Sequence, residues 1–120
     1  MSGIGDYNPM RKFETGATRD SEDGKLDYEG FLSPAVEERF AEYMHTHRKQ
    51  SDGSLRSADN WQKGIPEDVY MKSLFRHFMD VWKAHRGLPA PDLEESLCAM
   101  KFNVNGMLYE VLKKHEPDKL

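Results

Sequence analysis

The stretch Ser73-Leu-Phe-Arg-His-Phe-Met-Asp80 is the part of the chain that most strongly predicts a fold, because helical spacing separates its side chains into two kinds. One face would carry Ser73, Arg76, His77 and Asp80. The other would carry large apolar groups, namely Met71, Leu74, Phe75, Phe78 and Trp82. Solvated helix faces are usually filled with Lys and Glu, whereas Arg, His, Asp and Ser suit a phosphate, a metal or a buried hydrogen-bond network. We therefore expect an amphipathic helix whose polar face belongs to a site.

Start and stop signals extend this helix and add two more. Proline and acidic residues before the quoted stretch, and Gly87 after it, predict a helix over 67–85. Ser33-Pro34 opens an earlier helix expected over 34–49, and Asp92 with Glu95 resembles a capping box for a third helix that continues to about residue 114. Residues 50–64 are rich in Ser, Asp, Gly and Asn, and they are expected to form a long loop of the kind that is often functional.

The third helix is expected to be apolar on two sides. Its main stripe consists of Leu93, Leu97, Met100, Val104, Met107, Leu108 and Val111, and its opposite face carries Ala99, Phe102, Gly106 and Tyr109. Such a helix lies between neighbours or at a subunit contact. The small residues Ala99 and Gly106 would allow close approach, so we expect a dimer or tetramer built partly on this helix.

The chain divides into an extended N-terminal arm, residues 1–32, and an all-α helical domain, residues 33–120. The arm contains several glycines and no sustained helical or strand period, although apolar residues such as Phe13 and Phe31 could anchor it. At 120 residues the chain is one small domain. The fold class expected is a small helical bundle that forms a homo-oligomer.

Composition narrows the possible partners. The net charge of -4 argues against binding to a DNA or RNA polymer, because no basic excess exists to neutralise a run of phosphates. The single cysteine, Cys98, excludes a disulfide framework and is expected in the core. No window is apolar enough to span a membrane, and no leader pattern is present. We expect a soluble, cytoplasmic protein that binds a small molecule.

Carboxylates on the first two helices could hold a metal. Glu38 and Glu42 are one turn apart, an arrangement that suits Mg²⁺ or Mn²⁺, although a solvated acidic face is the simpler alternative. On the second helix His77 and Asp80 could join them, or could hydrogen-bond to each other in a polar core. Glu95 could be a further ligand, or could serve the start of its helix.

Other residues could bind the ligand directly. Arg76 could form a bidentate contact with a phosphate, or could pair with a carboxylate. Lys25 and Lys63 could fold over phosphates, and Trp61 could stack on a base or fill a gap in the core. Asn103 lies in the middle of an apolar helix, where its amide would orient a ligand or bridge two helices.

The ordered strings 11–19 (RKFETGATR), 24–28 (GKLDY), 60–66 (NWQKGIP), 75–78 (FRHF) and 102–105 (FNVN) resemble a phage-associated family. It is named for the N-terminal domain of dATP/dGTP diphosphohydrolases, and the likeness spans about residues 11 to 113. The resemblance implies a MazG-like, all-α, oligomeric fold, and it adds Asn60 to the ligand-binding residues. If the protein is phage-encoded, its compartment would be the host cytoplasm.

The resemblance also implies a chemistry. Enzymes of the MazG type use carboxylate pairs and Mg or Mn to cleave a nucleoside triphosphate to the monophosphate and pyrophosphate. This chain departs from the pattern, because Glu38 and Glu42 are four apart and His77 stands where a Glu is expected.

The leading expectation is a protein that binds a purine (deoxy)nucleoside triphosphate. It would hydrolyse the α-β phosphate bond if Glu38, Glu42 and Asp80 act as the catalytic metal ligands. The alternatives are a non-catalytic sponge that sequesters a host immune nucleotide signal, and an assembly or interaction domain.

Overall fold

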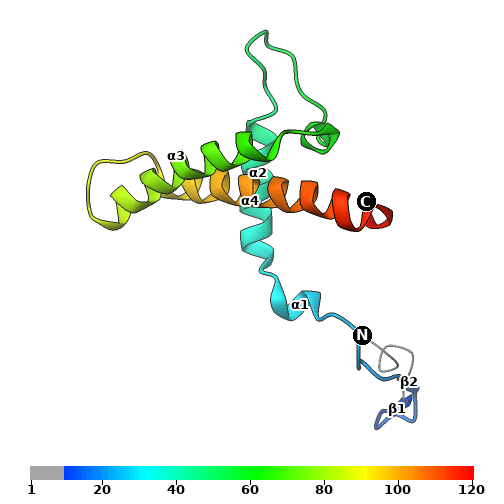
Figure 1. Cartoon of the computed structure of the whole chain (residues 1–120). Helices are drawn as coiled ribbons and strands as arrows, with labels where there is room; N and C mark the ends of the chain where they lie inside the picture. The colour runs from blue at the N-terminus through cyan, green and yellow to red at the C-terminus, as the bar shows by residue number, and fades with distance from the viewer. Residues whose placement is uncertain (1–9) are drawn as a thin grey trace. The chain divides into compact units, whose positions relative to one another are not determined.

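The computed structural model describes residues 10–120, and most of this part of the chain is helical (Figure 1). It divides between Ser33 and Pro34 into two compact units, and each is described by itself. In the first unit β1 (Met10–Lys12) pairs antiparallel with β2 (Thr18–Asp20), and α1 (Tyr28–Phe31) forms a single turn. The segment expected to be extended therefore contains a small hairpin. Strands of three residues are too short to show a period in the sequence.

The second unit begins with α2 (Pro34–Thr46), which ends three residues before the expected position. The amide of His47 still donates to the carbonyl of Tyr43, but the backbone that follows bonds to the loop instead of continuing the helix. Lys49 bridges to Leu55, and the amide of Arg56 donates to the carbonyl of Arg48 at 2.8 Å. Gly53 turns the chain with a φ of 87°, a value that favours glycine. The loop therefore has a defined shape, and it leads into a 3-10 turn, η2 (Asn60–Lys63).

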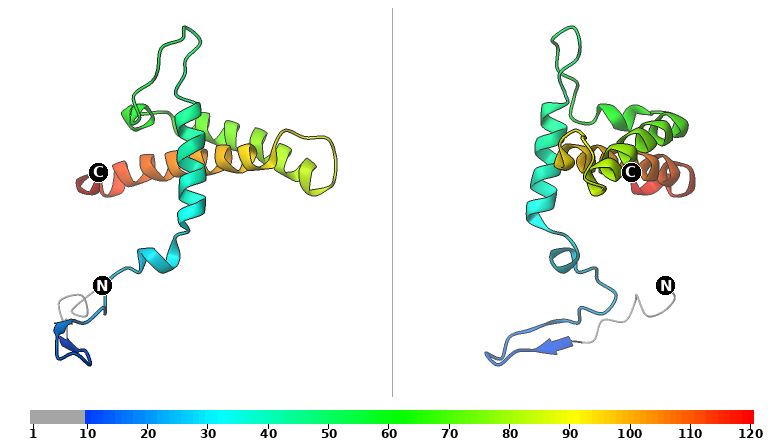
Figure 2. Two further views of the ribbon diagram at one scale, coloured as in Figure 1. Left: turned by 180° about the vertical axis from the view of Figure 1, so that it is seen from behind. Right: turned by 90° about the vertical axis from the view of Figure 1, so that its left-hand side faces the viewer.

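The helices α3 (Glu67–His85) and α4 (Leu93–His115) lie side by side as an antiparallel hairpin, followed by the short turn η3 (Pro117–Lys119) (Figures 1 and 2). Both helices agree with the predicted bounds within one or two residues. Gly87 ends the α3 segment at a φ of 73°, and the Asp92 carboxylate accepts from the amide of Glu95 at 3.2 Å. The predicted glycine stop and acidic cap are thus confirmed.

The tightest packing lies between α3 and α4 around Tyr70, which is 1% exposed. Its ring stands edge-on to Phe102, with 5.8 Å between the ring centroids, and it occupies the space in which a Cβ at Gly106 would stand. Ala99 is also buried, and so is Cys98, as expected. The expectation that Ala99 and Gly106 open a subunit contact is therefore corrected, because Gly106 is used by Tyr70 of the same chain and Ala99 is covered within it.

The contact between α2 and α4 is ionic. Arg39 Nε lies 2.8 Å from the Glu94 carboxylate, and Lys101 Nζ lies 3.5 Å from that of Glu37. The figures show α2 running steeply across one side of the hairpin (Figure 2). Several large apolar side chains of α3 and α4 are exposed, and they include Phe75 and Leu108.

No helix within residues 10–120 combines the length and the apolar character that a membrane span requires.

Candidate functional site

A groove of about 890 Å³ lies between α2, the loop, η2 and α4. Its volume falls in the range of small-molecule sites, which is roughly 300 to 1,000 Å³. The lining residues come from all four segments and are Glu37, Phe40, Ala41, Tyr43, Met44, His45, His47, Arg48, Arg56, Ser57, Ala58, Asn60, Trp61, Ile65, Phe102 and Asn105. Basic side chains, aromatic rings and amides thus gather in one cavity, although the lining residues are spread over 69 positions of the sequence, from 37 to 105.

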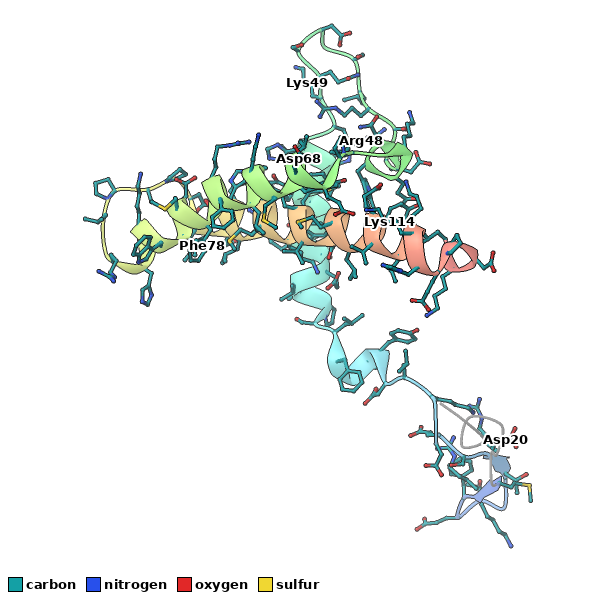
Figure 3. The ribbon with its side chains drawn as sticks, viewed as in Figure 1. Asp20, Arg48, Lys49, Asp68, Phe78 and Lys114 are labelled. Carbon is teal, nitrogen blue, oxygen red and sulfur yellow. The ribbon has the colours of Figure 1, made fainter. Side chains whose placement is uncertain are left out.

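Two arginines form the cationic side of the groove, and each guanidinium group is oriented by a hydrogen bond to a main-chain carbonyl of the opposite segment. Arg48 Nε donates to the carbonyl of Arg56 at 2.8 Å, and Arg56 Nη1 donates to the carbonyl of His47 at 2.9 Å. Arg48 lies where α2 meets the loop (Figure 3). Each of these bonds uses one of the five guanidinium N–H groups, so both arginines are oriented while most of their donors can serve an anion.

Aromatic rings form the other walls. Trp61 packs edge-on against Tyr109, with 4.9 Å between the ring centroids, and also lines the groove. Its two expected roles, as a packed ring and as a platform for a base, are therefore compatible in this position. Tyr43 and His47 approach to 4.1 Å between ring centroids, and Lys101 Nζ lies 5.1 Å from the centre of the Phe40 ring. These rings offer flat apolar surface beside the cationic groups.

Burial and charged groups where α2 meets α4 influence the protonation state of Tyr43, which lines the groove. Burial, followed by the nearby Glu95 carboxylate, raises the pKa of Tyr43, so its hydroxyl stays a neutral hydrogen-bonding group at physiological pH. His47 Nε2 lies 3.6 Å from Glu95 Oε2, and this pair is ionic when His47 is protonated. The hydrogen bond to Glu94 raises the pKa of Arg39, which keeps the guanidinium charged.

The structure places the predicted ligand-binding residues in several locations. Asn60 and Trp61 line the groove, whereas Lys63 ends η2 outside the lining. Lys25 belongs to the first unit, Met1–Ser33. Asn103 is buried, and its amide donates to the carbonyl of Ala99 at 2.7 Å within α4. The expected bridge between two helices is therefore replaced by a bond to the residue four positions earlier in the same helix.

The α3 face that was expected to carry the site is partly turned inward. Helical spacing puts Ser73 and His77 on the side of Tyr70, which packs on α4, and both are half-buried, as is Asp80. Arg76 is exposed, and none of these four residues lines the groove. The apolar face of α3 is mostly exposed in the single chain. That Arg76 and His77 contact phosphates stays a prediction.

The predicted metal ligands are not gathered in the described part of one chain. Glu38 and Glu42 are exposed on α2, while Glu95 Oε1 lies 3.7 Å from Arg39 and Glu95 Oε2 lies 3.6 Å from His47. Within residues 10–120 no group of three or more His, Cys, Asp or Glu is placed to hold a metal ion. The Mg or Mn site of Glu38, Glu42, His77, Asp80 and Glu95 stays a prediction.

Sequence reasoning missed the arginines and rings that the fold brings together. Arg48 and Arg56 stand eight positions apart on either side of Gly53, and this spacing suggests a turn that pairs them. Tyr43 and His47 are one helical turn apart, a signal that marks a shared face but not a cavity. The groove itself depends on the crossing of α2 over α4, which no local pattern specifies.

Comparison of the chain with protein family models, with curated proteins and with solved structures gave no match.

Proposed function

We propose that the protein binds a purine (deoxy)nucleotide in the groove between α2, the loop and α4. The observation that carries the proposal is the presence of two oriented arginines, Arg48 and Arg56, beside aromatic rings in one cavity of about 890 Å³. A nucleotide combines a planar ring with a compact anion, and this groove supplies a surface for each. The preference for purines rests on the resemblance of residues 11–113 to the diphosphohydrolase family.

The ligand is held by two kinds of contact. The phosphates lie against the guanidinium groups of Arg48 and Arg56, whose planar N–H groups match phosphate oxygens. The base lies on the aromatic side, where Trp61 offers its ring and the Asn60 and Asn105 amides supply donors and acceptors for base edges. The overall negative charge of the protein does not oppose this, because the groove concentrates the cationic groups locally.

Hydrolysis of the α-β phosphate bond is the extension of this proposal that the family resemblance suggests. Mg²⁺ or Mn²⁺ held by Glu38, Glu42 and Asp80 would supply an activated water. These residues stand on two different helices and do not line the groove of the single chain. Sequestration of a nucleotide without cleavage needs the groove alone, and the same experiment separates the two activities.

The experiment is calorimetry with ATP, dATP, GTP, dGTP and inorganic triphosphate, followed by mass spectrometry of each mixture after incubation with Mn²⁺. The proposal predicts that the nucleotides bind more tightly than inorganic triphosphate, because the base adds its stacking contact. Monophosphate and pyrophosphate as products would establish hydrolysis, and Glu42→Gln should then abolish them. An unchanged nucleotide would establish sequestration.

A variant of Trp61 localises the ligand. Trp61→Leu should weaken binding of the preferred nucleotide by about 1 to 3 kcal/mol, the usual contribution of base stacking on an aromatic ring, and should leave inorganic triphosphate unaffected. Trp82→Phe is the control, since the chain has two tryptophans and Trp82 lies on α3 outside the groove. Failure of all five ligands to bind, or an equal effect of both variants, would contradict the proposal.

A further inference from the structure

The groove is lined by two separate groups of aromatic rings, and one bound base occupies only one of them. Trp61 of η2 lines the groove and packs edge-on against Tyr109 of α4. The second group lies on α2 and at its end, and it consists of Phe40, Tyr43 and His47, all of which line the groove. Within the described residues no ring contact connects the two groups. We call the second group the α2 ring strip.

The α2 ring strip is continuous. Its positions 40, 43 and 47 are separated by three and four residues, so the three rings share one face of the helix. The Phe40 and Tyr43 rings are nearly parallel, with 14° between their planes and 6.5 Å between their centroids, and the centroid of the His47 ring lies 4.1 Å from that of Tyr43. At a rise of 1.5 Å per residue the strip extends about 10 Å along the helix axis. A planar base can stack on such a surface.

The strip is also accessible to a ligand. Phe40 and Tyr43 are half-buried, and the His47 side chain is 55% exposed. Tyr70, whose ring only fills the contact between two helices, is by contrast 1% exposed. Part of the aromatic surface of the strip therefore faces the groove.

Along the chain, the paired arginines stand between the two groups of rings. Arg48 directly follows His47, and Arg56 Nη1 donates to the carbonyl of His47 at 2.9 Å, so the arginine pair adjoins one end of the strip. Trp61 follows Arg56 by five positions. The order is thus rings, arginines and ring, which is the order of a molecule made of base, phosphates and base.

The size of the groove agrees with a ligand of this kind. Its volume of about 890 Å³ lies near the upper end of the range for small-molecule sites, which is roughly 300 to 1,000 Å³. A mononucleotide with its base on Trp61 and its phosphates on the arginines would leave the α2 ring strip in contact with water. A second base would cover this apolar surface.

We propose that the groove takes a compound with two bases joined through phosphates, with one base on Trp61 and the other on the α2 ring strip. The phosphates between the bases meet Arg48 and Arg56. This inference rests on the proposed function, because it keeps the same arginines and the same tryptophan, and it adds the strip as a second base site. Linear dinucleoside triphosphates and cyclic dinucleotides share this chemistry.

Calorimetry on the full chain tests the inference and separates the two kinds of compound. It compares diadenosine triphosphate and cyclic di-AMP with ATP, and diguanosine triphosphate and cyclic di-GMP with GTP. At least one two-base compound should bind roughly 5- to 150-fold more tightly than the mononucleotide with the same base, the usual gain from one more stacked base. A gain with the linear compound alone identifies a dinucleoside polyphosphate as the ligand class, and a gain with the cyclic compound alone identifies a cyclic dinucleotide.

Variants of the strip locate the second base. Tyr43→Leu should remove the gain of the two-base compound and leave the affinity for the mononucleotide unchanged, whereas Trp61→Leu should weaken the binding of both. Tyr43→Phe is the matched control, since it keeps the ring and should keep the gain. If Tyr43→Leu does not fold, His47→Ala takes its place, because the largely exposed His47 ring can be removed with little loss of packing and should also reduce the gain.

Two results would overturn this inference and leave the proposed function standing. The first is a mononucleotide that binds as tightly as every two-base compound with the same base. The second is a gain that survives both Tyr43→Leu and His47→Ala, which would place the second base away from the strip. Failure of every compound to bind would instead overturn this inference together with the proposed function.

Discussion

The helix α4 makes two contacts of opposite character. Toward α3 it is close and largely apolar, with Gly106 against the buried ring of Tyr70. Toward α2 it is ionic, with Arg39 on Glu94 and Glu95 and with Lys101 on Glu37. Close packing fixes a geometry in one arrangement, whereas half-exposed ion pairs are weaker and depend on salt.

This difference favours the α2 side as the place of the proposed nucleotide binding. The groove uses the polar crossing of α2 and α4, where water reaches charged groups and an anion can replace it. The closely packed α3–α4 hairpin supports this crossing. Disturbing each contact separately should therefore have separable consequences.

The largest effect is expected from Gly106→Val, because the new side chain would stand in the space of the Tyr70 ring. We expect a loss of about 3 kcal/mol in the free energy of unfolding, at the upper end of the range for overpacked cores. Urea denaturation measures it. Combining the change with Tyr70→Leu should recover part of the loss, because the ring atoms that clash are removed. A double variant as unstable as the sum of the two single variants would refute the Tyr70–Gly106 contact.

Arg39→Gln should have a smaller effect that depends on ionic strength. It removes the ion pairs with Glu94 and Glu95, and it should lower the melting temperature at low salt by less than Gly106→Val does. Near 1 M salt, where the Debye length is about 3 Å, the difference from the wild type should shrink. Arg76→Gln is the control, since Arg76 is exposed and has no ion pair within the described residues. Equal behaviour of the two variants would argue against an ionic α2–α4 contact.

The smallest effect at neutral pH is expected from Tyr70→Phe. The hydroxyl is buried without a hydrogen-bond partner in the described residues, so its removal should change the free energy of unfolding by less than about 1 kcal/mol. Burial, followed by the Glu110 charge, raises the pKa of Tyr70 above 10.0. A raised folded-state pKa means that the contribution is complete below 10.0 and is lost as pH rises through the folded value.

Comparing urea denaturation near pH 8 with that near pH 11 checks this sign. Between these two conditions the wild type should lose more stability than Tyr70→Phe, because the phenylalanine has no proton to release. A clear loss in Tyr70→Phe already near pH 8 would show that the hydroxyl has a partner.

The sequence predicted the helices better than it predicted their faces. Caps and stops are local, so Gly87 and Asp92 marked the ends of α3 and α4 correctly. The burial of Cys98 was also predicted from its apolar surroundings. The pattern separated the two faces of α3, but it did not show that Phe75 is exposed in the single chain while His77 is half-buried. An apolar stripe marks a face that needs cover, and the sequence does not say whether the same chain provides it.

The candidate site was predicted in part. Asn60 and Trp61 were chosen and line the groove, whereas Arg48 and Arg56 were not chosen. Their role depends on the turn at Gly53 and on the crossing of α2 over α4, which are set by contacts between distant segments. Arg76 looked equally suitable on spacing alone, and it lies on a different surface.

Arg56 in the groove and Arg76 on α3 provide the most direct test of the proposed site. Calorimetry with the preferred nucleotide should compare Arg56→Lys with Arg76→Lys, since each keeps the charge and removes the planar fork. The groove predicts that Arg56→Lys weakens binding by about 1 to 3 kcal/mol, roughly 5- to 150-fold, while Arg76→Lys binds like the wild type. Circular dichroism should show the same helical content in both. The opposite result, with binding lost in Arg76→Lys and retained in Arg56→Lys, would contradict the groove and place the ligand on α3.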